Sequence, residues 1–289
     1  CCGTKQNTYQ TLDSMKILFN EGTFLDTADE ASRASFRKTH PDLLADIAKL
    51  THDVKSNHQL AQRIKNKFKM KNTTGFSLNA LVDFEDPFEV LQHLMIGSEG
   101  TLGFIAEITY KTVKDDPFKA SSLIIYPDNE KACQASSLLR SQPVAAVELM
   151  DRAGLRTMQN AEGIPSYIKD LSDKACSLLV QTNADSKEKL YQQIDQITNS
   201  IESIPTELPF SFTDDPKAYN AYWKIRKGLY PSVGAMRQTG TTVIIEDVTF
   251  PTPRLAEATS ALQELFTKYN YDEAVIFGHA LEGNIHFVF

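Results

Sequence analysis

Cysteine and long apolar runs are scarce in this sequence of 289 residues, and each scarcity disfavours a class of protein. The four cysteines, Cys1, Cys2, Cys133 and Cys176, form no CxxC pair, and no histidine stands at zinc-finger spacing, so a structural zinc site or a disulfide scaffold is not expected. No apolar run approaches the roughly 20 residues that cross a bilayer. Asp and Glu outnumber Lys and Arg by 37 to 30, and a charge of −7 disfavours nucleic acid, which binds basic faces. We therefore expect free thiols, no nucleic-acid partner and a cytoplasmic location, with peripheral membrane association left open.

The sequence also lacks an initiator methionine and a signal peptide, because its first residues have neither a basic start nor an apolar stretch. This favours a piece of a longer protein. Apolar residues make up 42% and charged residues 23%, which is ordinary for a globular chain, and the length favours two domains. Asp115-Asp116-Pro117 interrupts the pattern, so the predicted domains are 1–116 and 117–289.

After this break, segments typical of strands and of helices alternate. Strands are expected at 121–126, 145–150, 176–183, 241–248, 274–279 and 285–289, and helices at 128–141, 151–159, 186–200, 219–228 and 252–269. A β-α-β-β-α-β order predicts an α+β domain of ferredoxin-like type, with an antiparallel sheet and helices on one face.

A loop rich in small residues stands near the end of the first predicted domain. Residues 97–103, Gly-Ser-Glu-Gly-Thr-Leu-Gly, hold three glycines and run into an expected strand at 104–113. Such a loop lets backbone amides approach a ligand closely, although a tight turn before a strand explains the same residues. It is neither a GxGxxG motif nor a P-loop, and without that glycine fingerprint an NAD-dependent enzyme is not expected.

The C-terminal residues suggest a second site. Glu282-Gly283-Asn284 is turn chemistry between strand formers, so we expect a hairpin that brings His279 and His286 across from one another. Two imidazoles at that distance share a divalent metal or flank a substrate; an inert pair is the alternative. Arg226 follows Trp223, the only tryptophan, by three residues on one helical face. It either holds a carboxylate or packs its stem on the indole ring.

Several motifs together resemble one protein family. Residues 94–105, Leu-Met-Ile-Gly-Ser-Glu-Gly-Thr-Leu-Gly-Phe-Ile, are similar to the segment that closes its flavin domain, and residues 278–286, Gly-His-Ala-Leu-Glu-Gly-Asn-Ile-His, resemble its GHxxxGNxH element. Shorter matches are Cys2-Gly3 with Tyr9, Thr74 to Leu78, and Val147 to Asp151. The chain thus resembles the FAD-linked oxidases of the vanillyl-alcohol-oxidase type, in the branch of D-lactate, glycolate and D-2-hydroxyglutarate dehydrogenases.

The resemblance implies a partial FAD-binding domain followed by a cap domain that binds the substrate. The implied reaction is oxidation of a D-2-hydroxy acid, D-2-hydroxyglutarate or D-lactate, to the 2-oxo acid. His279 and His286 would hold a divalent metal, Zn or Mn, or position the substrate hydroxyl, and Arg226 would clamp the carboxylate. The residues implied to lie along the FAD are Cys2, Gly3, Thr74, Gly75, Gly97, Ser98, Glu99, Gly100, Thr101, Gly103, Ile105 and Asn284.

The sequence also departs from the family's pattern. The Ala-Leu-Glu-Gly-Asn-Ile-His variant is similar to a subgroup of large proteins in which a downstream iron–sulfur domain would pass electrons to the acceptor, and no cysteine cluster follows here. Ile245 and Val288 stand where relatives have Lys and Asn. The resemblance therefore implies a fragment that binds flavin weakly and is inactive alone; the alternative is a non-catalytic binding or structural module with the same fold.

Overall fold

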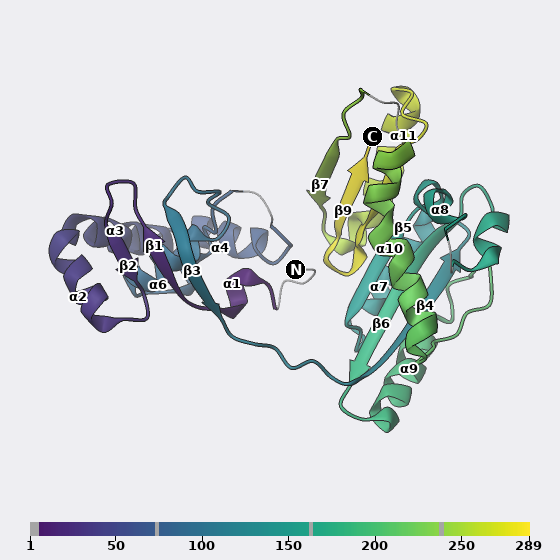
Figure 1. Ribbon diagram of the computed structural model, residues 1–289, viewed down its shortest axis with the longest axis horizontal. Coiled ribbons are helices and arrows are strands. Elements are labelled where there is room, and N and C mark those ends of the chain that lie inside the picture. Colours follow the sequence, from purple (N-terminus) through teal and green to yellow (C-terminus); the bar gives the residue numbers. More distant parts are fainter. Residues whose placement is uncertain (1–5, 73–74, 162–163, 237–239) are drawn as a thin grey trace. The chain divides into compact units, whose positions relative to one another are not determined.

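The chain divides into two compact units between Lys114 and Asp115 (Figure 1). The computed structural model describes residues 6–72, 75–161, 164–236 and 240–289. Three residues predicted to contact the flavin, Cys2, Gly3 and Thr74, lie outside the described residues. Each unit is described by itself.

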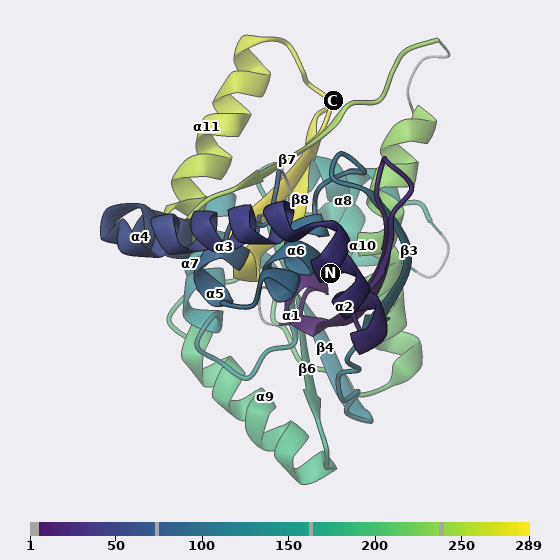
Figure 2. The ribbon, with the colours of Figure 1, turned by 90° about the vertical axis from the view of Figure 1, so that its left-hand side faces the viewer.

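The first unit is a three-stranded antiparallel sheet packed against helices. Its strand order is β2-β1-β3, formed by Phe24–Asp26, Leu12–Leu18 and Phe104–Tyr110. The helices are α1 Thr8–Thr11, α2 Glu30–Thr39, α3 Pro41–Ser56, α4 His58–Lys67, α5 Ala80–Asp83 and α6 Pro87–Met95; α3 and α4 follow one another across the front of Figure 2. Asp29 and Asp86 accept backbone N–H groups at the starts of α2 and α6, and Pro41 begins α3, as proline suits a first helical turn.

The second unit contains a six-stranded antiparallel sheet in the order β4-β6-β5-β8-β9-β7. Its strands are β4 Phe118–Tyr126, β5 Ala146–Met150, β6 Cys176–Ala184, β7 Ile245–Thr249, β8 Val275–His279 and β9 Asn284–Val288. Its helices are α7 Asn129–Leu139, α8 Arg152–Met158, α9 Lys187–Ile201, α10 Pro216–Met236 and α11 Leu255–Lys268, with short 3-10 turns η1 Ser166–Asp170, η2 Thr252–Arg254 and η3 Ala280–Glu282. The predicted α+β class with an antiparallel sheet is confirmed.

The expected placement of helices on one face of this sheet needs a correction. Successive residues of β4 enter two separate cores, Ile124 with α7, α9 and α11, and Leu123 and Ile125 with α8 and α10. Because neighbouring side chains of a strand point to opposite faces, the run of buried residues in β4 requires cover on both sides. Here α8 and α10 supply the second layer, and α10 extends well beyond the predicted residues 219–228.

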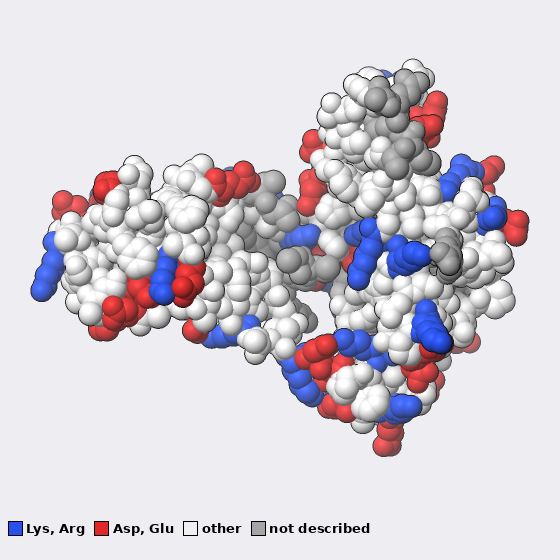
Figure 3. Space-filling view, viewed as in Figure 1, with Lys and Arg blue, Asp and Glu red and all other residues white. Residues whose placement is uncertain are grey.

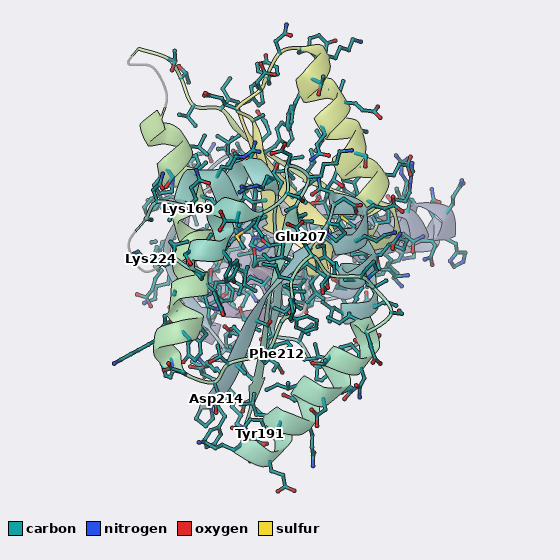
Figure 4. All side chains as sticks on the ribbon, turned by 90° about the vertical axis from the view of Figure 1, so that its right-hand side faces the viewer. Lys169, Tyr191, Glu207, Phe212, Asp214 and Lys224 are labelled. Carbon is teal, nitrogen blue, oxygen red and sulfur yellow. The ribbon has the colours of Figure 1, made fainter. Side chains whose placement is uncertain are left out.

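An irregular segment protects the β4 edge of the sheet. Residues 205–215 follow this edge, where the Glu207 N–H donates to the Ile125 carbonyl and Thr213 pairs with Ser121. Figure 4 labels three members of the segment, Glu207, Phe212 and Asp214, and Tyr191 of α9 donates a hydrogen bond to Asp214. Covering an edge strand in this way removes a template for intermolecular strand pairing.

On the face shown in Figure 3, Lys and Arg are interspersed with Asp and Glu over both units. A search of the described helices finds none long and apolar enough to span a bilayer.

Candidate active site

The C-terminal hairpin brings His279 and His286 together, although not in the expected register. His279, the last residue of β8, pairs with Asn284, and His286 of β9 pairs with Phe277, so the two histidines are diagonal neighbours rather than directly opposite. Diagonal side chains on one face of a pair of strands remain within reach of each other. The two ring centroids lie 5.3 Å apart with nearly perpendicular planes.

Gly283 makes this turn possible. Its φ is +66°, and a Cβ atom at this position would lie 2.0 Å from the carbonyl oxygen of Phe250. The Phe250 N–H also donates to the Gly283 carbonyl. The segment after β7 therefore packs directly on the turn, and any side chain at position 283 is excluded.

Glu148 is the central residue of the site, and it was not singled out from the sequence as a site residue. It lies in β5 and is 2% exposed. Its Oε1 is 2.7 Å from the His279 Nδ1, and its Oε2 accepts a hydrogen bond of 2.8 Å from the Arg226 Nε. Since a carboxylate only accepts, the Nδ1 of His279 is the donor in this hydrogen bond.

Arg226 reaches the site from α10. Its guanidinium carbon lies 4.8 Å from the centre of the Phe277 ring, while the indole Nε1 of Trp223 donates to Gln181 instead. Glu148 occupies only the Nε, so the two terminal nitrogens of Arg226 have no partner among the described residues. A guanidinium held in this way offers its terminal fork to a second carboxylate.

β7 supports the histidines from the other side. The Asp247 carboxylate lies 3.8 Å from the Nδ1 of His286. The amide nitrogen of the fully buried Asn284 donates to Asp247, to the Val248 carbonyl and to the Thr249 hydroxyl. The visible role of Asn284 is therefore to attach the hairpin to β7. Of the neighbouring acidic residues, Glu246 points to solvent and Asp247 faces the site.

Of the predicted flavin residues that are described, Gly75 and Gly97 to Thr101 belong to two touching loops in the first unit. Gly97 has a φ of +81°, and a Cβ there would lie 2.8 Å from the Gly75 carbonyl oxygen; the Ser77 hydroxyl donates to the Ile96 carbonyl. Together with Tyr9, the two loops line a cavity of about 270 Å³. That volume lies below the usual range for a complete ligand site.

The loop after Gly97 is stabilised from within. Ser98 is buried, and its carbonyl accepts from both the N–H and the hydroxyl of Thr101. Glu99, at a φ of +51°, and Gly100 are exposed, and their backbone amides donate to no acceptor among the described residues. Successive free amides in such a loop suit an anionic or carbonyl oxygen.

Two further residues that were predicted to lie along the FAD, Gly103 and Ile105, pack within the first unit. Ile105 of β3 packs its half-buried side chain on the core of the first unit, and a Cβ at Gly103 would approach the Leu18 carbonyl. Both residues visibly serve packing. Among the residues that the structure describes, no group of three or more His, Cys, Asp or Glu side chains is arranged to hold a metal ion.

Comparison with known families identifies the class of protein. Residues 116–289 match the family model described as FAD linked oxidases, C-terminal domain. The chain therefore belongs to this family of FAD-linked oxidoreductases, as the motifs around Gly97 and His279 predicted.

Individual relatives give a narrower view. The chain is 30% identical over 200 residues to the mitochondrial D-lactate dehydrogenase [cytochrome] of Arabidopsis thaliana, covering 68% of this chain and 33% of that protein. It is 29% identical to a D-lactate dehydrogenase of Anaerostipes hadrus and 25% identical to the glycolate oxidase subunit GlcD of Bacillus subtilis, covering 68% of this chain and 41% and 40% of those proteins. The chain thus spans about a third to two fifths of the length of these relatives.

Solved structures show the same fold. An alkyldihydroxyacetonephosphate synthase matches with a TM-score of 0.56 at 12% identity, covering 99% of this chain and 48% of that one. The 4-ethylphenol oxidase of Gulosibacter chungangensis matches with a TM-score of 0.50 at 11% identity, covering 99% of this chain and 52% of that one.

Proposed function

We propose that this chain is part of an FAD-dependent dehydrogenase that oxidises a D-2-hydroxy acid to the 2-oxo acid, with D-lactate as the first substrate to test and D-2-hydroxyglutarate as the second. In this proposal, residues 1–116 are the end of the FAD-binding domain and residues 117–289 the substrate domain. The names of the relatives, which include D-lactate dehydrogenases and a glycolate oxidase subunit, support this choice. The proposed location is the cytoplasm, where the buried Cys133 and Cys176 remain thiols.

One observation carries the proposal: the buried Glu148 holds His279 and Arg226 side by side, and His286 lies against His279. The free fork of Arg226 suits the substrate carboxylate. A hydroxyl on the adjacent carbon is then within reach of an imidazole, because the same carboxylate positions both side chains. A 2-hydroxy acid presents these two groups in this order.

The protonation states follow from the contacts. With the Nδ1 of His279 donating to Glu148, its Nε2 is the atom that accepts the substrate hydroxyl proton. The imidazolium that forms lies against the Glu148 carboxylate, which stabilises the new charge. When bound, FAD supplies the two-electron redox chemistry, and an acceptor such as an iron–sulfur domain would receive the electrons. Gly75, Gly97, Ser98, Glu99, Gly100 and Thr101 are the described residues that we propose to contact FAD.

A divalent metal, Zn²⁺ or Mn²⁺, on His279 and His286 is a separate part of the proposal. The described residues supply two imidazoles without a third ligand arranged for coordination, so no step is routed through a metal. Titration calorimetry of the chain with each ion tests it, with His279→Ala and His286→Ala as the variants expected to abolish binding. Equal binding by these variants would place the metal elsewhere.

The experiment for the main proposal compares this chain with the longer protein of which we propose it is a piece. Dye-linked oxidation of D-lactate, L-lactate, D-2-hydroxyglutarate and glycolate is measured in both, together with flavin content after purification. We expect the chain alone to lose its flavin and to be inactive. We expect the longer protein to prefer a D-2-hydroxy acid and to lose turnover by ~10²-fold or more in the His286→Ala variant.

Gln181→Ala is a control that removes the Trp223 hydrogen bond without touching Glu148, His279 or Arg226. Its turnover is expected to stay near that of the parent protein. A flavin-containing longer protein that oxidises none of the four acids would refute the proposal, and full activity of His286→Ala would remove this imidazole from the reaction.

A further inference from the structure

A second cavity of about 590 Å³ lies within residues 115–289 and is independent of the proposed function. It opens where β4 and β5 end and where β6 and β8 begin, between the first turns of α7 and α8 and one side of α11. Ala274 in its wall precedes β8, whereas His279 ends that strand. Five residues of extended chain span roughly 16 Å, so the cavity and the histidines lie at opposite ends of β8.

Among the described residues, two side chains in the wall of this cavity leave buried polar atoms without hydrogen-bond partners. Asn129, the first residue of α7, is 6% exposed, and neither its amide oxygen nor its amide nitrogen has a partner. Arg152, the first residue of α8, is 7% exposed; its Nε and Nη1 have no partner, and its Nη2 makes one long contact of 3.3 Å with the carbonyl of Lys169, labelled in Figure 4. A buried donor or acceptor that nothing satisfies destabilises the fold, so such atoms are expected to have a partner.

The charges around these two residues favour an anion that also carries a donor. Arg156 and Asp173 neutralise each other at 2.5 Å, and Asp151 is occupied by the backbone N–H groups of Gly154 and Ile276. Asp128 and Glu130 also line the cavity; Asp128 accepts the Lys131 N–H at the start of α7, and Glu130 lies 3.9 Å from the Lys131 Nζ. Lys174 and Asp272 complete the charged lining, and neither has an ion-pair partner among the described residues.

The charges that remain to be matched are thus two positive, on Arg152 and Lys174, and two negative, on Asp128 and Asp272. The ligand must therefore present both a negative group and a donor. Asp128 is the N-cap of α7 and already supplies a negative group at that helix N-terminus, so the place for the ligand's carboxylate is beside Arg152. Burial and the nearby Arg156 lower the pKa of Arg152, and the more distant Asp173 and Glu207 offset this only in part.

We propose that this cavity binds a small organic carboxylate bearing an amino or hydroxyl group, with Arg152 and Asn129 as its principal contacts and Lys174 at its rim. The carboxylate satisfies the buried guanidinium and amide, and the amino or hydroxyl group faces Asp272. The cavity volume lies within the range of metabolite sites, which exceeds what a bare inorganic ion requires.

The test is titration calorimetry of the 289-residue chain with L-glutamate, succinate and inorganic phosphate. We expect saturable binding of L-glutamate, weaker binding of succinate, which lacks the amino group, and little or none of phosphate. Arg152→Met is expected to weaken L-glutamate at least about tenfold, the factor for one lost charge-assisted hydrogen bond. Its melting temperature without ligand should not fall, because an apolar side chain removes buried unpaired nitrogens.

Arg254→Met is the matched control, since this arginine is exposed, paired with Glu257 and absent from the cavity wall. Arg226→Met separates the two sites: it should keep L-glutamate binding even if the proposed dehydrogenase function fails. Lys174→Gln, on the exposed rim, provides a second variant if Arg152→Met does not fold. The proposal is overturned if no carboxylate binds saturably or if phosphate alone binds. It is also overturned if Arg152→Met binds L-glutamate as tightly as the parent chain. If Arg152→Met is unfolded, undiminished binding by Lys174→Gln overturns it instead.

Discussion

Replacing Glu148 by glutamine tests the arrangement on which the candidate site depends. The carboxylate accepts from His279 and from Arg226 at 2.7 and 2.8 Å, and the side chains of all three residues are at most 15% exposed. The amide of Gln has one acceptor, its oxygen, and one donor, its NH₂ group. If the oxygen accepts from Arg226, the NH₂ group faces the Nδ1 of His279, and both are donors unless the ring proton moves. Glu148→Gln therefore either breaks one contact or moves the His279 proton to Nε2.

The expected loss of stability is that of one hydrogen bond to a charged group, ~1.5–3 kcal/mol. For a unit of this size it corresponds to a fall of about 3–12 °C in melting temperature. Trp223 is the only tryptophan and lies in α10 of the second unit, so urea unfolding followed by its fluorescence reports on this unit. The proton position is read from the ¹⁵N–¹H couplings of the His279 ring, which should change from the Nδ1–H to the Nε2–H pattern.

Glu246→Gln makes the same chemical change at an exposed position of β7 in the same sheet, and should alter stability by less than ~0.5 kcal/mol. If Glu148→Gln is as stable as this control and leaves the ring of His279 with its proton on Nδ1, then the carboxylate does not hold the two side chains, and the proposed substrate site loses its basis.

Three further predictions concern stability. Burial raises the pKa of Asp151 to about 7 from 3.8, so between these values the folded chain keeps a proton that the unfolded chain releases. The unfolding free energy should therefore fall by ~4 kcal/mol between pH 4 and pH 7. Urea titrations followed by Trp223 fluorescence should show this slope, and Asp151→Asn should flatten it. Burial lowers the pKa of His93 below its usual value of 6.5, so as the pH falls the unfolded state takes up the proton first and the first unit should lose stability. His93→Phe should remove this loss when unfolding is followed by far-UV circular dichroism. The same loss of stability at low pH in this variant would contradict the prediction. Gly283→Ala should destabilise the second unit by ~1–3 kcal/mol or more, because its methyl group meets the Phe250 carbonyl. Gly240→Ala is the control, since Gly240 also has a positive φ but lies in open space, and it should lower the stability less. Equal melting temperatures for the two variants would refute the steric argument.

The local parts of the site were readable in the sequence. Glu282-Gly283-Asn284 between strand formers indicated the hairpin, and that hairpin places His279 and His286 at neighbouring positions. The register was predicted less well, because η3 and the left-handed Gly283 set which residues pair, and this depends on the packing of Phe250 against the turn. Helix starts at Asp29, Asp86 and Asp128 follow the same local capping chemistry.

Residues far apart in the sequence were harder to connect. Glu148 lies 131 positions from His279 and 78 from Arg226, and no periodicity within a strand or helix reports such a contact. From the sequence alone, an apolar strand with one acidic residue is interpreted as a core strand. The role of the acidic residue becomes visible only when the side chains that bind it are known. The second helical layer was missed for the same reason, since β4 shows that both faces are buried but not which helices bury them.

The sequence by itself determined the strands of the second unit, the turn between the two histidines and the family to which the chain belongs, because these depend on residues close together in the chain. Only the tertiary structure decided that Glu148 joins His279 to Arg226, that helices cover both faces of the sheet, and that Asn129 and Arg152 share one cavity. Each of these contacts forms when strands or helices from distant segments pack together, and a buried charge acquires its role only once its partner is in place.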